Sequence, residues 1–128
     1  MRALLDTHTF LWAVSEATLL GRQATAVLTS ASSELYLSYV SAWEMVIKHA
    51  KGRLRLPQPP LDFIRVEAAR NRIHLLAVSW PHLASLHELP VHHGDPFDRM
   101  LVAQARAEGL ALVSADRQLA SYGVPVIW

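Results

Sequence analysis

The sequence predicts an α/β fold in which helices cover both faces of a mostly parallel central sheet. Short apolar runs alternate with amphipathic stretches along the chain, and signals for hairpins are few. A parallel sheet needs such an alternation, because each crossover between its strands is usually a helix. At 128 residues the chain has the size of one ordinary domain, so we expect a single domain over residues 1–128.

Five short apolar runs have the character of buried strands. The first is a three-residue run near the start of the chain, and the second is rich in Leu and Tyr. The predicted strands are Ala3–Leu5, Leu35–Tyr39, Ile73–Val78, Ala111–Ser114 and Val124–Ile127.

The clearest helix lies between the second and third strands. Its apolar residues Trp43, Val46, Ile47 and Ala50 recur at i, i+3, i+4 and i+7, which predicts one buried face. Gly52 can end this helix.

The other helices are predicted from amphipathic stretches between the strands. Pro96 is well placed at the first position of an alanine-rich helix, and the proline-rich stretch Leu56–Pro60 is a loop, as is Pro90–Gly94. A first helical segment starts at Phe10–Val14. The remaining helices are Gln23–Ala31 (beginning near Gly21), Leu61–Arg70, Pro81–Glu88, Pro96–Glu108 and Arg117–Tyr122.

Composition excludes several classes of function. The chain has no cysteine, which rules out disulfides, thiolate metal sites and thiol nucleophiles and fits a reducing cytoplasm. No apolar run approaches the roughly 18 residues that span a bilayer, so we expect a cytoplasmic protein without a signal peptide or a membrane partner.

The formal net charge is only +1, so any nucleic-acid-binding charge must be local. Walker, dinucleotide-binding, serine-hydrolase and HExxH zinc motifs do not occur.

Acidic residues follow several of the predicted strands. Asp6 ends the first strand, Glu44 follows the second, Asp95 and Asp98 open the alanine-rich helix, and Asp116 follows the fourth strand. In parallel sheets, sites form beyond the carboxyl ends of the strands. We therefore expect these carboxylates to converge on one edge of the sheet.

Most of these acids also have a purely structural explanation. Ser41 to Glu44 has the pattern of a capping box, and Glu44 lies four residues before Lys48, a favourable surface pair. Asp95 and Asp116 could cap the helices that follow them. Asp6 differs, because the sequence shows no convincing helix start for it to cap.

Carboxylates that are packed together repel one another unless a cation neutralises them. Mg²⁺ prefers oxygen ligands and keeps waters, one of which can become a nucleophile. The pattern therefore indicates metal-assisted hydrolysis of a phosphodiester.

The chain resembles the PIN-domain ribonuclease toxins of the VapC family, which belong to type II toxin–antitoxin pairs. The matching segments span nearly the whole chain in the family's order: LLDTHTFLWA at Leu4–Ala13, SAWEMVIKHAKGRL at Ser41–Leu54, HGDPFDRMLVAQA at His93–Ala105, and LVSAD with YGVPVIW at the end. The resemblance implies a three-layer α/β/α sandwich, a homodimer, an RNA substrate, and an antitoxin that blocks the site and commonly binds DNA itself.

The resemblance also implies the roles of particular residues. Asp6, Glu44, Asp98 and Asp116 would form an acidic quartet that holds Mg²⁺ or Mn²⁺ and cuts RNA. Asp95 could be a ligand, a supporting residue or only a cap. Thr7 and Ser114 could orient the carboxylates through their hydroxyls.

Three further questions stay open at the level of sequence. His92 and His93 could assist at the site, although adjacent loop histidines are more often solvated. The basic run could line the RNA path or only compensate a helix dipole; it consists of Lys48, Lys51, Arg53 and Arg55. The same acids could also serve a metal-dependent DNA nuclease or phosphatase, or be caps in a non-enzymatic α/β binding domain.

Overall fold

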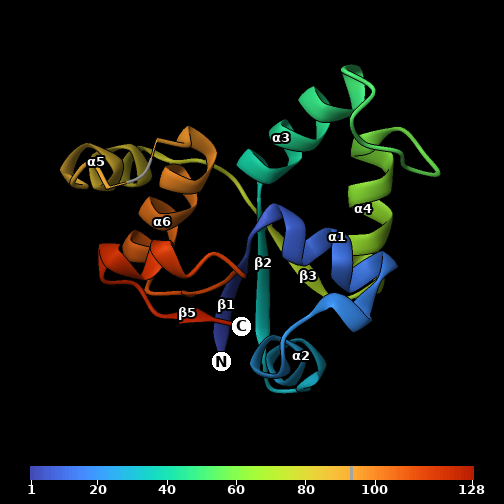
Figure 1. The fold of residues 1–128 in the computed structure, drawn as a ribbon, viewed down its shortest axis with the longest axis horizontal. Coiled ribbons are helices and arrows are strands. Elements are labelled where there is room, and N and C mark those ends of the chain that lie inside the picture. Colours follow the sequence, from blue (N-terminus) through green and yellow to red (C-terminus); the bar gives the residue numbers. More distant parts are fainter. Residues whose placement is uncertain (93) are drawn as a thin grey trace.

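The central sheet is fully parallel, which confirms the predicted fold class. The computed structural model describes residues 1–92 and 94–128, and within them five strands pair in the order β3-β2-β1-β4-β5 (Figure 1). Strands β3 and β5 are each two residues shorter than the sequence predicts. The strands are β1 (Arg2–Leu5), β2 (Glu34–Ser38), β3 (Ile73–Leu76), β4 (Ala111–Val113) and β5 (Val126–Ile127).

Helices connect the strands in the predicted order. Helix α6 has the predicted bounds, because Pro96 occupies its first turn and Gly109 ends it in the left-handed conformation at φ 67°. The α-helices in the described residues are α1 (Thr7–Ser15), α2 (Arg22–Thr29), α3 (Tyr39–Ala50), α4 (Pro60–Arg70), α5 (Trp80–Glu88) and α6 (Pro96–Glu108), and the 3₁₀ helices are η1 (Ala17–Leu19) and η2 (Arg117–Tyr122). Within these residues no helix is long and apolar enough to cross a membrane.

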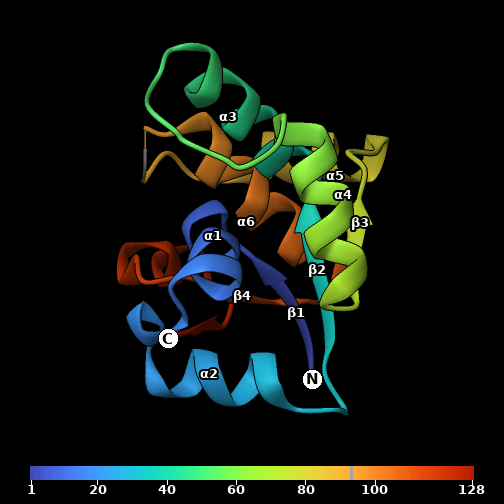
Figure 2. The same ribbon diagram turned by 90° about the vertical axis from the view of Figure 1, so that its right-hand side faces the viewer.

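Two apolar layers flank the sheet and make the three-layer sandwich. Successive residues of a strand point to opposite faces, so Ala3 and Leu5 pack in a cluster with α1, α2 and α4, whereas Leu4 and Leu112 pack in a cluster with α6 and η2. Figures 1 and 2 show α5 and α6 on one side of the sheet and α1, α2 and α4 on the other.

The face of α3 that packs into the core is not the predicted one. Val40 and Met45 are buried, while Trp43 and Val46 are 60% and 39% exposed. Helix α3 carries apolar residues on two stripes. The i, i+3, i+4 spacing of the sequence indicates the stripe that faces away from the sheet.

The predicted capping box at Ser41 is also wrong. Helix α3 begins directly after β2, and the Ser38 hydroxyl caps it by accepting a hydrogen bond from the Val40 amide at 3.0 Å. Ser41 therefore lies inside the helix, where its buried hydroxyl has no hydrogen-bond partner among the described residues. Glu44 is consequently one turn further into the helix than a capping box would place it.

Candidate acidic site at the strand ends

The direction in which successive strands are added to the sheet changes between β1 and β4. The chain adds β2 and β3 on one side of β1, and then β4 and β5 on the other side. Leu5 pairs with Val113 in the register, and the Asp6 amide donates to the Val113 carbonyl at 3.1 Å. Such a switch point is where ligands bind in open α/β sheets. Asp6 and the segment after β4 therefore stand at the position where a site is expected.

Asp6 caps α1, contrary to the expectation that it has no helix to cap. Its Oδ1 accepts a hydrogen bond from the Thr9 amide at 2.8 Å, and the buried Thr9 hydroxyl donates to the Val113 carbonyl at 2.9 Å. The helix starts at Thr7, three residues earlier than predicted, with no loop between strand and helix. Thr9, which sequence reasoning missed, thus fixes both Asp6 and the β4 end. The cap uses one carboxylate oxygen, and Oδ2 accepts no hydrogen bond from a described residue.

Glu44 is held by two neighbours that the sequence singled out. Its Oε1 accepts a hydrogen bond from the Thr7 hydroxyl at 2.7 Å, and its Oε2 lies 2.8 Å from the Lys48 ammonium. The Glu44 side chain is only 13% exposed, and Thr7 is buried. Because Thr7 directly follows Asp6, this hydrogen bond ties α3 to the end of β1.

Asp95 is the N-cap of α6, as the sequence predicts. Its Oδ1 accepts hydrogen bonds from the amides of Phe97 at 2.8 Å and of Asp98 at 3.2 Å. Asp98 lies in the first turn of the same helix, and both acids are half-buried. The N-terminal end of α6, which attracts anions, therefore carries two carboxylates.

Asp116 caps the 3₁₀ helix η2 after β4. Its Oδ1 accepts a hydrogen bond from the Gln118 amide at 3.0 Å. The buried Ser114 hydroxyl accepts from the Asp116 amide at 3.1 Å, so Ser114 fixes the backbone of Asp116 rather than its carboxylate.

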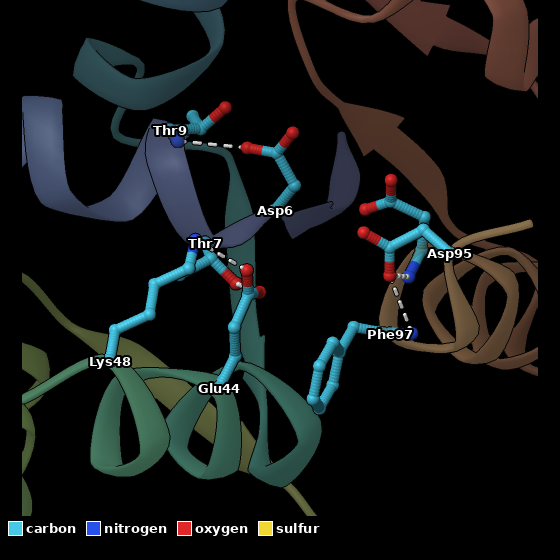
Figure 3. A network of polar contacts seen from close by, with 8 residues as sticks. Asp6, Thr7, Thr9, Glu44, Lys48, Asp95 and Phe97 are labelled. Carbon is cyan, nitrogen blue, oxygen red and sulfur yellow. Dashed lines mark hydrogen bonds and ion pairs between the residues drawn. The ribbon is translucent and has the colours of Figure 1, made fainter. Parts of the chain in front are cut away.

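The acids share one edge of the sheet but are not drawn into a tight cluster. Figure 3 shows Asp6, Glu44 and Asp95 facing a common region from the end of β1, from α3 and from the start of α6. In residues 1–92 and 94–128, no group of three or more His, Asp or Glu side chains is arranged to hold a metal ion. The acidic quartet as a set of metal ligands stays a prediction.

The donor set nevertheless suits a hard divalent cation. Mg²⁺ is usually held by one or two carboxylates and keeps several waters, so it does not need three converging side chains. Asp6 offers the oxygen that its cap leaves, and Glu44 already carries the cation of Lys48 on Oε2. Asp6 and Glu44, which Thr7 joins, are therefore two of the residues that would hold the ion.

The structure also gives the positions of the predicted basic run and of His92. Lys51, Arg53 and Arg55 are exposed beyond the end of α3, which Figure 1 shows pointing away from the sheet. Of the run, Lys48 alone has a described ion pair with one of the acids. The exposed His92 lies against Tyr122, with ring centroids 5.2 Å apart, and His93 lies outside the described residues.

Comparison with known proteins agrees with the fold. The chain is 29% identical over 123 residues to Ribonuclease VapC22 of Mycobacterium tuberculosis, a match that covers 95% of this chain and 92% of that protein. Two solved structures share the fold. VapBC2 from Rickettsia felis, bound to a promoter DNA fragment, has a TM-score of 0.74 at 12% identity and covers 98% of this chain and 97% of that one. A toxin–antitoxin complex from Klebsiella pneumoniae has a TM-score of 0.61 at 18% identity and covers 98% and 96%.

A family model also matches. The model described as the PIN domain covers residues 3–125, which include the edge of the sheet with all the candidate acids. The chain therefore belongs to the PIN-domain family.

Proposed function

We propose that this chain is a metal-dependent endoribonuclease and the toxin component of a toxin–antitoxin pair. The relative VapC22 is named a ribonuclease, and it matches almost the full length of this chain. The observation that supports the proposal is the position of Asp6 at the end of β1 and beside β4, at the switch point of the sheet, next to Thr7, whose hydroxyl holds Glu44 of α3.

Each acid has a separate part in this proposal. A bound Mg²⁺, with Mn²⁺ as a substitute, supplies an activated water and stabilises charge on the phosphate. Asp6 and Glu44 bind the ion from β1 and α3, and the Thr7 hydroxyl holds Glu44 in place. Asp98 and Asp116 are the further ligands of the ion, while Asp95 keeps its carboxylate on the amides of α6.

A substrate panel tests the proposed specificity. Purified protein with Mg²⁺ is given single-stranded RNA, single-stranded DNA and a phosphomonoester. Cleavage of RNA alone supports the proposal. Cleavage of DNA, or release of phosphate from the monoester, would instead support the DNA-nuclease or phosphatase alternative, because the same acidic site can serve either reaction.

One observation favours a non-enzymatic candidate. Asp6, Asp95 and Asp116 each cap a helix, which gives three of the acids a purely structural use. An α/β binding domain with capping acids predicts that the protein binds no divalent metal. Calorimetric titration with Mn²⁺ separates the two candidates, because the nuclease must bind the ion.

The exposed apolar surface beside α3 supports a homodimer. A groove of about 430 Å³ lies between α3, α4 and the edge strand β3, and Trp43, Leu61 and Leu75 on it are 60%, 60% and 43% exposed. An apolar patch of this kind on an unpaired sheet edge is typical of a subunit interface. We assign it to a second copy of this chain, joined by an isologous contact.

Sedimentation at micromolar concentration should then give about twice the 14.3 kDa mass of the chain. Leu61→Glu should yield monomers, because it buries a charge in the interface. Leu19→Glu is the matched control, since Leu19 is 48% exposed but does not line the groove. A wild-type monomer over a wide concentration range contradicts the assignment.

The basic run should contact the RNA backbone. Replacing Lys51, Arg53 and Arg55 by glutamine should weaken binding to unrelated RNA sequences alike. Each lost contact with single-stranded RNA lowers the salt slope of log K by about 0.7, so loss of three lowers it by about 2. The measurement is RNA affinity against salt concentration, and an unchanged slope would leave these cations as helix-end charges.

We also propose a cytoplasmic location for this chain, where the RNA substrate is found. We further propose a cognate antitoxin that binds this chain and blocks the acidic edge. The structural match to the Klebsiella pneumoniae toxin–antitoxin complex supports the partner. Co-expression with a candidate antitoxin should give a stable complex in which RNA cleavage is suppressed.

A further inference from the structure

Lys48 already provides a cation at the acidic site. Its ammonium lies 2.8 Å from Glu44 Oε2, and the two side chains are 36% and 13% exposed. The other oxygen of Glu44 is held by the Thr7 hydroxyl at 2.7 Å. Glu44 is thus engaged at both oxygens by groups of this chain, and Figure 3 shows Lys48 reaching from α3 toward this carboxylate.

Asp6 has no comparable cation. No Lys, Arg or His in the described residues forms an ion pair with Asp6, although it adjoins Thr7, the hydrogen-bond partner of Glu44. Together Asp6, Glu44 and Lys48 carry one negative charge in excess, so this corner of the site attracts a further cation.

A divalent ion on Asp6 and Glu44 would compete with Lys48. The Lys48 ammonium lies against Oε2 of Glu44, so an ion bound to this oxygen would lie a few ångströms from the ammonium in a partly buried site, where their repulsion is strong. The Thr7 hydrogen bond to Oε1 fixes the orientation of the carboxylate, so Glu44 cannot turn to separate the two cations. The ammonium must leave when the divalent ion binds.

We propose that Lys48 is an exchangeable counter-ion that couples metal binding to RNA binding. Without metal it neutralises Glu44; with metal it is released to a phosphate oxygen of the RNA backbone. The inference rests on the proposed nuclease function and adds an order of binding to it. The metal binds first and frees Lys48, which then forms part of the RNA site.

The position of Lys48 allows both roles. A lysine ammonium is a point charge on a flexible four-carbon stem, so it can move to a new anion without any movement of α3. Lys51 follows the last residue of α3, three residues after Lys48, so the released charge extends the basic run toward the acids. Because coupling between two binding sites is reciprocal, bound RNA must also tighten metal binding.

The first test measures metal affinity in the absence of RNA. Lys48→Met keeps most of the stem but removes the competing charge, so Mn²⁺ should bind about five-fold more tightly by calorimetry, the effect of losing an ion pair of modest strength. Lys51→Met is the matched control, with the same change in net charge but no ion pair to Glu44; its Mn²⁺ affinity should stay within about two-fold of wild type. Lys48→Arg retains the charge and should bind Mn²⁺ as wild type does.

The second test measures the coupling itself. The probe is a short single-stranded DNA that stays intact during the assay, since backbone contacts do not depend on the sugar. Wild-type protein should bind it more tightly when Mn²⁺ is present, and Lys48→Met should lose most of that gain. A thermal transition in EDTA close to that of wild type shows that the variant is folded.

Three outcomes would overturn the proposal. If Lys48→Met binds Mn²⁺ no better than Lys51→Met, or more weakly than wild type, Lys48 is a surface partner of Glu44 and no more. If Mn²⁺ does not change the affinity of the wild type for the probe, no coupling exists, although RNA cleavage can stand. A wild-type protein that binds no Mn²⁺ removes both this proposal and the metal-dependent function.

Discussion

Asp6→Asn is expected to reduce RNA cleavage by more than about 100-fold and to leave the fold intact. Changes to residues that only support metal ligands cost 10–100-fold, so loss of a ligand should cost more. Asparagine caps helices as well as aspartate does, so its amide oxygen can still accept the Thr9 hydrogen bond. The Tm in EDTA should be unchanged or higher, because removing one of several like charges relieves repulsion.

The matched control for this variant is Asp62→Asn. Asp62 is exposed in the first turn of α4 and carries the same charge, but it does not lie at the strand ends. It should cleave RNA at close to the wild-type rate. Full activity of Asp6→Asn would show that Asp6 is a helix cap alone.

Asp95→Ser and Asp98→Ser are expected to have opposite effects on metal binding. Serine is a good N-cap, so Asp95→Ser should accept the amides of Phe97 and Asp98 and keep the fold and most of the activity. Asp98→Ser should also fold, because the favourable first-turn charge that it removes contributes about 0.3–1 kcal/mol. It should, however, lose Mg²⁺-dependent cleavage by about 100-fold or more, as a ligand does.

Calorimetric Mg²⁺ titration of both variants distinguishes the two roles. The titration should show binding by Asp95→Ser and a loss of binding by Asp98→Ser. The reverse result would mean that Asp95 is the ligand and that Asp98 supports the helix.

The sequence predicted the sheet and α6 well, for physical reasons. Buried parallel strands are continuous apolar runs, so the five strands were visible as separate segments. Helix α6 is bounded by Pro96 and Gly109, two residues with strong conformational preferences, and its predicted limits matched the structure.

The sequence was less informative where a helix follows a strand without a loop. Helices α1 and α3 begin immediately after β1 and β2, so no turn residue marks their starts. For this reason the sequence does not predict the cap by Asp6, and it indicates Ser41 as the cap in place of Ser38. The spacing of Trp43 and Val46 predicts a core face, but both residues are exposed, because periodicity identifies an apolar face and not the surface that packs against it.

The spacing of the acids could not be predicted at all. The alternation of strands and helices predicts that Asp6 and Glu44 lie on one edge of the sheet. The contacts that orient their carboxylates depend on side-chain geometry, which this alternation does not determine. The Thr7 hydrogen bond joins α1 to α3 and depends on how those helices pack, whereas the Lys48 ion pair lies within α3 and confirms the pair that the four-residue spacing predicts.

The dependence of RNA cleavage on Mg²⁺ tests the central claim most directly. Purified wild-type protein is assayed on single-stranded RNA over a range of Mg²⁺ concentrations and in EDTA, with Asp6→Asn alongside. We predict a cleavage rate that rises to saturation with Mg²⁺, disappears in EDTA, returns when Mg²⁺ is restored, and is lost in the variant. Cleavage that is equal in EDTA and in Mg²⁺, or no cleavage at any Mg²⁺ concentration, would contradict the assignment of these carboxylates to a catalytic metal.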